Sequence, residues 1–336
     1  MSKIIILGAG PSGSSCAISL LKAGHEVTII DRSHFPRNAP GETLHPGIEP
    51  LLKELGVSRI LENGYFMRHE GIESLKESQS KFIAYNEDEA WKGFQLFRAD
   101  FDHQLLNEAI GLGAQFIPKC TISKLSTNQG FVESIEVNNT VINVDFIIDA
   151  TGKRAWLANE LGVRFSWKGA QKIAYYGYVK EASFQPENPR IEWDENGWTW
   201  IARVKDDLTA WVRLDLDVHR KVDNDWIPTK LKDGKSTGGR KAVDVTWRIA
   251  EPCSFANCFL VGDAAFVLDP GASHGVLKAI MSGMMAAHLI EQSKTHSMAK
   301  IHEHYNSWMQ NQFDHDVTKL RELYEKYEVK TNANNV

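Results

Sequence analysis

Three glycines near the N-terminus have the spacing of a turn that binds a dinucleotide. Residues 8–13 read Gly-Ala-Gly-Pro-Ser-Gly and follow the apolar run of residues 4–7, which predicts a buried parallel strand. Gly8 permits a tight turn, Gly10 lets a pyrophosphate approach the backbone, and Gly13 lets the next helix pack on the strand.

An acidic residue completes this motif. Asp31 ends the second predicted strand, 18 residues after Gly13, and its carboxylate can accept hydrogen bonds from a ribose hydroxyl. Pro11 and Ser12 begin the helix between them, and the free N–H groups of a helix N-terminus attract a phosphate. The motif indicates a dinucleotide site, but alone it does not separate FAD from NAD.

A second turn, far along the chain, favours FAD. A predicted strand ends at Gly262, and the carboxylate of Asp263 suits ribityl hydroxyls, although a surface aspartate before a helix cap is the alternative. A Pro-Gly turn then begins a helix whose N–H groups would stabilise negative charge at the N1–C2=O edge of reduced flavin. An NAD dehydrogenase needs no such site. The residues assigned to this segment are Gly262, Asp263, Pro270, Gly271, Ala272, Ser273 and Gly275.

Four residues are candidates for catalysis. His274, beside the second turn, could tune the flavin or move protons, or could only cap the helix. Glu42 and His45 lie in a loop that we expect to cross the flavin ring, where either could act as a general base or only fix the loop. Lys76 is the fourth, although a lysine in a predicted strand is more often solvated.

Cationic and aromatic side chains extend the candidate site. Arg98, at the start of a predicted helix, could hold a phosphate or ribityl group, or could be a solvated cap. The chain has ten tryptophans, and four of those between residues 165 and 250 could stack on an aromatic substrate and exclude water, or could be ordinary sheet core. These four are Trp193, Trp198, Trp200 and Trp211.

Two kinds of element must position these residues. The strand-turn-helix pattern at the start, which returns near residue 257, predicts an α/β fold with a doubly wound parallel sheet. Alternating apolar residues in the middle predict an inserted, mostly antiparallel β domain for the substrate, and helices follow it. The predicted boundaries are 1–65, 95–164 and 250–297 for the FAD-binding domain, 66–94 and 165–249 for the β-rich substrate domain, and 298–336 for the C-terminal helical segment.

Composition narrows the classes of partner. The net charge of −5 gives no sign of nucleic acid or an anionic membrane, and no apolar run is long enough to span a bilayer. The four cysteines are scattered without partners at ligand spacing, so we expect no metal and reduced thiols in a cytoplasmic protein. Residues 230–241 carry several basic side chains and are predicted to form a solvated loop.

The chain resembles a known superfamily at these positions. In order and in sequence, the motifs resemble those of glutathione-reductase-type FAD enzymes, among them aromatic hydroxylases and flavin-dependent halogenases. The resemblance rests on residues 8–13, 31–32, 40–43, 98, 149–152 and 262–275, and it adds Arg32, Thr43, Thr151 and Gly152 to the expected FAD contacts. More narrowly, four strings are similar to the LodB- and GoxB-like flavoproteins that mature tryptophylquinone enzymes: PGETLHPG, GFQLFRADFD, GWTWIA and VGDAAFVLDPGASHGVLKAIMSGMMAA.

The narrower resemblance implies a function. It implies an FAD-dependent monooxygenase that hydroxylates a Trp side chain of a partner, an amino-acid oxidase precursor, during cysteine tryptophylquinone biogenesis, which is a post-translational modification. NAD(P)H or a separate reductase would reduce the FAD. Two alternatives stay open: a small-molecule aromatic hydroxylase or flavin-dependent halogenase, and a flavin-bound maturation chaperone without turnover.

Two differences from the halogenase motifs favour hydroxylation over halogenation. Halogenases carry a W-x-W-x-I-P motif, whereas residues 198–203 keep both tryptophans but have Ala202 and Arg203 in place of Ile-Pro. Halogenases also use a lysine that receives hypohalous acid. Lys76 lies in roughly the expected region, but the sequence around it matches poorly.

Overall fold

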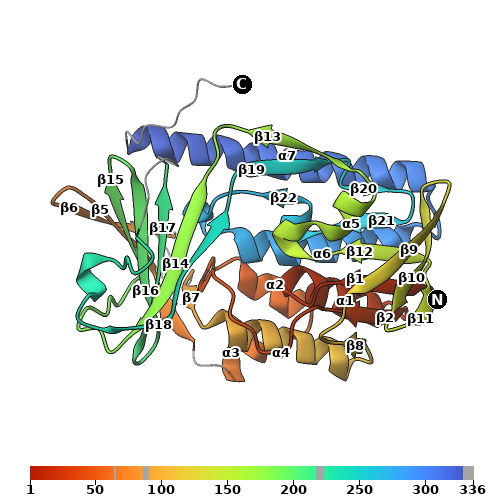
Figure 1. The fold of residues 1–336 in the computed structure, drawn as a ribbon, viewed down its shortest axis with the longest axis horizontal. Helices are drawn as coiled ribbons and strands as arrows, with labels where there is room; N and C mark the ends of the chain where they lie inside the picture. The colour runs from red at the N-terminus through yellow and green to blue at the C-terminus, as the bar shows by residue number, and fades with distance from the viewer. Residues whose placement is uncertain (64–65, 86–90, 217–222, 328–336) are drawn as a thin grey trace.

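Two sheets lie side by side along the molecule, and the C-terminal helix α7 (Met298–Lys326) runs along both of them (Figure 1). The computed structural model describes residues 1–63, 66–85, 91–216 and 223–327. Parts of the predicted domains therefore lie outside the described residues, namely 64–65, 86–90, 217–222 and 328–336.

The first sheet is the doubly wound parallel sheet that the sequence predicts. Its strands are β1 (Lys3–Leu7), β2 (Glu26–Ile30), β8 (Gln115–Ile117), β12 (Phe146–Asp149), β20 (Ser254–Phe255) and β21 (Cys258–Leu260). They run in the order β20-β21-β12-β1-β2-β8, and every neighbouring pair is parallel except β20 with β21. Ile4, Ile6 and Ile148 are fully buried, as expected of strands covered on both faces.

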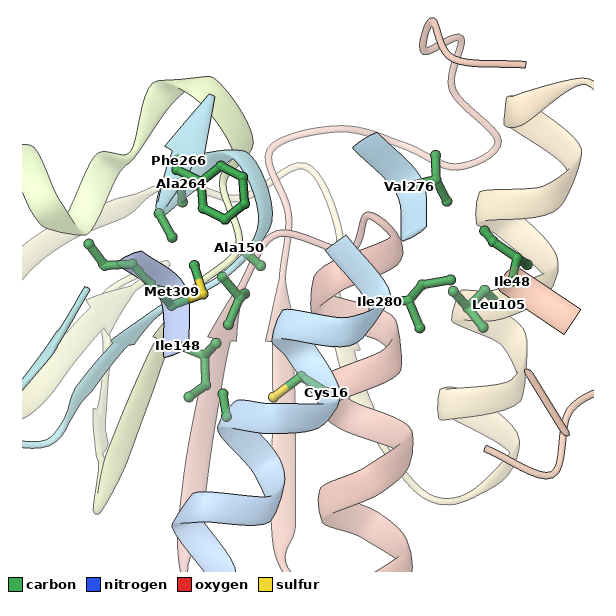
Figure 2. Close-up of a cluster of buried hydrophobic side chains, with 14 of the residues drawn as sticks. Cys16, Ile48, Leu105, Ile148, Ala150, Ala264, Phe266, Val276, Ile280 and Met309 are labelled. Atoms are coloured by element: carbon green, nitrogen blue, oxygen red, sulfur yellow. The ribbon is translucent and has the colours of Figure 1, made fainter. Parts of the chain in front are cut away.

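Helices α1 (Pro11–Lys22) and α6 (Gly275–Gln292) pack closely against each other. A Cβ atom at Gly283 of α6 would lie 2.3 Å from the carbonyl oxygen of Ser12, so only glycine permits this approach. Figure 2 shows Cys16 of α1 and Ile280 of α6 in the buried cluster around this contact. The other helices are α2 (Ile48–Glu54), α3 (Ile60–Asn63), α4 (Arg98–Gly111) and α5 (Trp156–Glu160).

The second sheet has seven strands and is mostly antiparallel, as predicted. Its strands are β5 (Gly71–Lys76), β6 (Gln79–Ala84), β14 (Ile173–Lys180), β15 (Arg190–Asp194), β16 (Gly197–Lys205), β17 (Leu208–Asp215) and β18 (Lys235–Asp244). They run in the order β18-β14-β17-β16-β15-β5-β6, and only the β15–β5 pair is parallel.

Three small sheets complete the described part of the fold. The first contains β9 (Ile122–Asn128), β10 (Phe131–Val137) and β11 (Thr140–Asn143). The second contains β13 (Arg164–Lys168), β19 (Trp247–Glu251) and β22 (Phe266–Val267), and the third contains β3 (Thr43–Leu44), β4 (Met67–His69) and β7 (Gly93–Gln95). Short 3₁₀ turns are η1 (Gly152–Arg154), η2 (Thr229–Leu231), η3 (Gly262–Ala264) and η4 (Pro270–Ala272).

The basic region 230–241 is not the loop that its sequence predicts. After η2 it enters β18, an edge strand that pairs antiparallel with β14. Lys235 and Lys241 on this strand are exposed. Charged side chains are a usual means of protecting an unpaired strand edge from further pairing, which accounts for a basic sequence in a strand.

Helix α7 has one long buried face. Tyr305, Met309, Phe313, Leu320 and Tyr324 lie on it and are each at most 1% exposed. Among the described residues, no helix, including this one, is both long and apolar enough to cross a membrane.

Candidate functional site

A cavity of about 890 Å³ is bordered by the C-terminal ends of the parallel strands and by one face of the seven-stranded sheet. Cofactor and ligand sites typically have ~300–1,000 Å³. The cavity is lined by nearly all the predicted cofactor residues. These are Gly8, Gly10, Pro11, Ser12, Asp31, Arg32, Glu42, Thr43, Arg98, Thr151, Gly152, Gly262, Asp263, Pro270, Ser273 and Gly275.

The glycine turn after β1 has the geometry that the motif predicts. Gly8 has a φ of +106°, and a Cβ atom there would lie 2.2 Å from the carbonyl oxygen of Ala150. A Cβ atom at Gly13 would lie 2.0 Å from the carbonyl oxygen of Gly8, so α1 packs directly on the turn. Gly10 lines the cavity, and the nearest atom to a Cβ there is Nη2 of Arg37, at 3.2 Å. The turn therefore leaves room for a pyrophosphate above Gly10.

Asp31 is fixed beside this turn by two backbone groups. Its Oδ2 accepts a hydrogen bond from the N–H of Ala9 at 2.8 Å, and its Oδ1 accepts one from Ser33 at 2.7 Å. Each carboxylate oxygen has a further lone pair, so ribose hydroxyls can still donate to it. The carboxylate at the cavity wall thus fits the ribose of FAD.

Arg98 holds the loop that crosses the cavity. Its Nε and Nη2 donate to the two carboxylate oxygens of Asp102 at 2.8 and 2.9 Å, and its Nη1 donates to the Pro40 carbonyl at 2.9 Å. Arg98 as a whole is 7% exposed. Its observed contacts are therefore structural, and a role in binding a phosphate or ribityl group stays a prediction.

Glu42 lies in the same loop, buried against the seven-stranded sheet. Tyr178 of β14 donates a hydrogen bond to its Oε1, and the N–H of Gly41 donates to its Oε2 at 2.8 Å. Burial raises the pKa of Glu42, although Tyr178 and Arg98 act in the opposite direction. Glu42 is therefore an acid on the cavity wall that holds its proton at a higher pH than an exposed glutamate.

The turn before α6 is anchored through Asp269. This carboxylate accepts hydrogen bonds from the N–H of Gly271 at 3.0 Å, from Nε1 of Trp247 at 2.6 Å and from the hydroxyl of Tyr324 at 2.7 Å. Gly271 lies in this turn, η4, and is not part of the cavity lining. Ser273 then adopts a φ of +54°, which redirects the chain into α6.

His274 also lines the cavity. His45 does not line it, but its ring contacts the ring of His274. The two rings meet edge to face with centroids 5.0 Å apart, and Nδ1 of His45 accepts the N–H of Gly47 at 3.0 Å. Burial and the neighbouring His274 lower the pKa of His45 to about 4. Nδ1 of His274 lies 3.9 Å from Oδ1 of Asp316, which forms an ion pair with Lys278.

Lys76 lies away from the candidates just described. It ends β5, where its backbone is opposite Gln79 on one side and Trp193 on the other. Lys76 is not among the residues that line the cavity. The structure therefore brings Glu42 and His274 to the cavity and His45 to its border, and a catalytic role for any of them stays a prediction.

The four predicted tryptophans divide into two groups. Trp198 and Trp200 of β16 line the cavity. Trp193 does not, because Tyr327 stacks on it with ring centroids 4.2 Å apart. Trp211 lies in a separate buried cluster. Only two of the four are thus placed to form a substrate wall.

Several residues of the cavity wall are not among those predicted from the sequence. Tyr176 of β14 lines it and is separated from Trp200 by Val212 of β17, and its position two residues from Ala174 follows the alternation of a strand. Lys153 lines it directly after the Thr151-Gly152 pair, and burial lowers its pKa. Asp269 is the residue before the predicted Pro-Gly turn, a position where a capping carboxylate is common.

Comparisons with known proteins agree with a flavin site. A family model described as FAD binding domain matches residues 1–213. The tryptophan 2-halogenase of Chondromyces crocatus is 26% identical over 327 residues, which cover 85% of this chain and 60% of that protein. The 1H-pyrrole-2-carbonyl peptidyl-carrier-protein brominase of Pseudoalteromonas luteoviolacea (strain 2ta16) is 26% identical over 318 residues, covering 86% and 77%. The structure of the myxobacterial chondrochloren halogenase CndH matches with a TM-score of 0.86 at 21% identity. The match covers 99% of this chain and 87% of that chain.

These relatives overturn the function predicted from the sequence. They are halogenases, and nothing in the comparisons points to tryptophylquinone maturation or to an amino-acid oxidase partner. The prediction of a LodB- or GoxB-like enzyme that hydroxylates Trp in a partner is therefore wrong. The strings behind it build the loop at Glu42, the start of α4, strand β16 and the segment from η3 into α6. They belong to the framework of the cavity, so they report the fold rather than the substrate.

Other predictions are confirmed. The fold is the glutathione-reductase-type α/β fold, the cofactor is FAD, and the class is that of FAD-dependent oxidoreductases. The chain spans 60% of the length of the tryptophan 2-halogenase. The match over residues 1–213, more than half of the chain, shows that the chain belongs to the FAD binding domain family.

Proposed function

We propose that this protein is a flavin-dependent halogenase that acts on an electron-rich aromatic or heteroaromatic ring. The observation that carries the proposal is the cavity, which joins the dinucleotide turn at Gly10 to an aromatic wall of Tyr176, Trp198 and Trp200. The relatives that halogenate tryptophan and a carrier-bound pyrrole group support this reaction. When bound, reduced FAD supplies the electrons with which dioxygen oxidises a halide to a hypohalous species.

The side chains of the cavity would bind the cofactor and the ring and keep water out. Trp198 and Trp200 are 1% and 8% exposed and can stack on a planar ring. The free N–H groups at the start of α1 would bind the pyrophosphate, and those at the start of α6 would face the flavin. The predicted division into an FAD-binding part and a β-rich substrate part, with the boundaries given above, belongs to this proposal.

Arg203 favours a second candidate, a small-molecule aromatic hydroxylase. It stands with Ala202 where halogenases carry Ile-Pro, and its guanidinium contacts Sδ of Met67 at 3.1 and 3.2 Å. If that difference lets the flavin react with the ring directly, the product carries oxygen instead of halogen. A single turnover assay distinguishes the two reactions by the atom that is added to the ring.

The test is a turnover assay with purified protein, FAD, a flavin reductase with NADH, dioxygen, and bromide or chloride. Tryptophan, indole and a pyrrole-2-carbonyl group on a carrier protein are offered separately, and products are analysed by mass spectrometry. A bromine isotope doublet that requires bromide supports halogenation. A gain of one oxygen without halogen would replace it with the second candidate. Neither product from any of these rings, with FAD bound and reduced, would contradict both.

A further inference from the structure

A buried carboxylate from the C-terminal helix faces the turn before α6. Lys278 lies in the first turn of α6 and lines the cavity, with its side chain 14% exposed. Asp316 lies in α7, does not line the cavity, and has a side chain 7% exposed. The two form an ion pair, and the other oxygen of Asp316 lies 3.9 Å from Nδ1 of His274. One carboxylate thus contacts two cavity residues from behind.

Two groups of the described chain that contact this trio, His45 and Phe266, are uncharged at pH 7. The ring of His45 lies 5.0 Å from that of His274, and its pKa is lowered to about 4, so His45 is neutral at pH 7. The ring of Phe266 lies 5.5 Å from Nζ of Lys278. Burial acts to raise the pKa of Asp316, but His274 and Lys278 outweigh it and hold that pKa below the ordinary value. Asp316 is therefore ionised, and its charge opposes that of Lys278.

We propose that Asp316 is a positioning residue of the flavin site, which holds Lys278 and His274 at the start of α6 and sets the net charge beside the flavin. This inference rests on the proposed placement of FAD against the turn before α6. Negative charge that develops on the flavin during reduction is stabilised by Lys278 and by the N-terminus of α6. Asp316 offsets part of that stabilisation, and it acts through its two partners because it does not reach the cavity.

The test is the midpoint potential of the bound FAD, measured by reductive titration against a reference dye. Asp316→Asn removes a negative charge and is expected to raise the potential, whereas Lys278→Met removes a positive charge and is expected to lower it. Each change should alter the ratio of the affinities for reduced and oxidised FAD by roughly tenfold, or ~30 mV for a two-electron couple. Asp316→Glu keeps the charge and should keep the wild-type potential.

The opposite signs distinguish this role from a merely structural one. A structural role would weaken FAD binding in both variants without moving the potential in opposite directions. Asp314→Asn is the matched control, because it removes the same charge from an exposed position two residues away on α7. If Lys278→Met alone does not fold, the Asp316→Asn and Lys278→Met double variant replaces it, and its potential should lie below that of Asp316→Asn.

Two failures can be told apart. Wild-type protein and the charge variants with equal potentials would overturn the inference alone, since FAD would be bound but insensitive to Asp316. Wild-type protein that takes up no FAD would overturn the proposed function and the inference with it. A potential that falls in Asp316→Asn would also overturn the inference, because the sign would be wrong.

Discussion

Two carboxyl groups on the cavity wall are almost removed from water. Glu42 is 5% exposed and Asp269 is 3% exposed, and burial raises the pKa of each. A raised pKa means that the folded protein keeps a proton that the unfolded chain has already released. The free energy of unfolding therefore decreases as the pH rises from the ordinary carboxyl pKa to the raised one. Glu42 and Asp269 thus make the stability of the protein depend on pH.

Glu42→Gln should remove one part of this pH dependence. Glutamine stays neutral, so the variant should gain stability relative to the wild type as the pH rises above about 4.5, the ordinary value for Glu. The lost hydrogen bond from Gly41 adds an offset that does not depend on pH. Urea unfolding from pH 4.5 to 8 measures the difference. A wild-type-minus-variant difference that is constant across this range would contradict the prediction.

Gly10→Val should block FAD uptake while the fold survives. The new side chain would project into the cavity above the turn, where the pyrophosphate must approach, and the nearest group there is the flexible end of Arg37. We expect FAD to bind at least ~100-fold more weakly, about 2.7 kcal/mol. Flavin fluorescence titration measures the change. Gly111→Val, where a Cβ atom meets nothing within 4 Å, is the control. Tight FAD binding by Gly10→Val would contradict the placement of the phosphate.

At the scale of elements, the contact between α1 and α6 sets the shape of the site. Both helices begin at the cavity, and Gly283 of α6 lies against the backbone of α1. The sequence indicates this close approach, because small residues recur every four positions along one face of α6. These are Gly275, Ala279, Gly283 and Ala287. A close helix pair thus holds two N-termini at the edges of one cavity.

Gly283→Ala should destabilise the protein although alanine favours helices. The propensity gain is about 1 kcal/mol, but the new Cβ atom would lie 2.3 Å from a backbone oxygen that cannot move aside. Overpacking of this kind typically costs ~1–3 kcal/mol, so the net effect should be a loss. Chemical denaturation measures it. Gly111→Ala in α4 meets nothing within 4 Å and should be neutral or stabilising. A stabilised Gly283→Ala variant would contradict the close approach.

Tyr324→Phe tests how α7 supports the turn before α6. The lost hydroxyl leaves the buried Asp269 without one of its donors, which should cost about 1–3 kcal/mol. Tyr327→Phe keeps the ring and loses only the hydrogen bond that the neutral hydroxyl of Ser74 donates to the Tyr327 hydroxyl, so it should cost less, ~0.5–1.5 kcal/mol. Thermal unfolding of both variants gives the comparison. A larger loss in Tyr327→Phe would contradict the role assigned to Asp269.

Local patterns predict the glycine turn, both sheets and most helices, because each is defined by neighbouring residues. The tryptophans show where such patterns end. Trp211 pairs with Ile201 and so lies on the sheet face opposite to Trp200, which becomes visible only when the register is known. Trp193 is paired with Trp198 but does not line the cavity, because Tyr327 at the end of α7 stacks on it. Tyr327 lies more than a hundred residues later in the chain. No periodicity contains that contact.

At the scale of the whole molecule, the two sheets and α7 share one hydrophobic core. A single buried cluster includes Ile4 of β1, Trp198 of β16 and Tyr324 of α7. Figure 1 shows α7 passing along both sheets, and its buried side chains from Ile301 to Tyr324 belong to the same cluster. The nucleotide turn and the aromatic wall are therefore parts of one packed body, and loosening either sheet should open the cavity.

This shared core predicts that the protein unfolds in one cooperative transition. Far-ultraviolet circular dichroism, tryptophan fluorescence and flavin release should give the same Tm, since the largest buried cluster joins both sheets to α7 and is disrupted when either sheet unfolds. Free FAD at 100 times its Kd should raise the free energy of unfolding by about 2.7 kcal/mol and shift all three signals together. An earlier transition in tryptophan fluorescence alone, with flavin still bound, would show that the seven-stranded sheet melts independently and that the aromatic wall is not held by the parallel sheet.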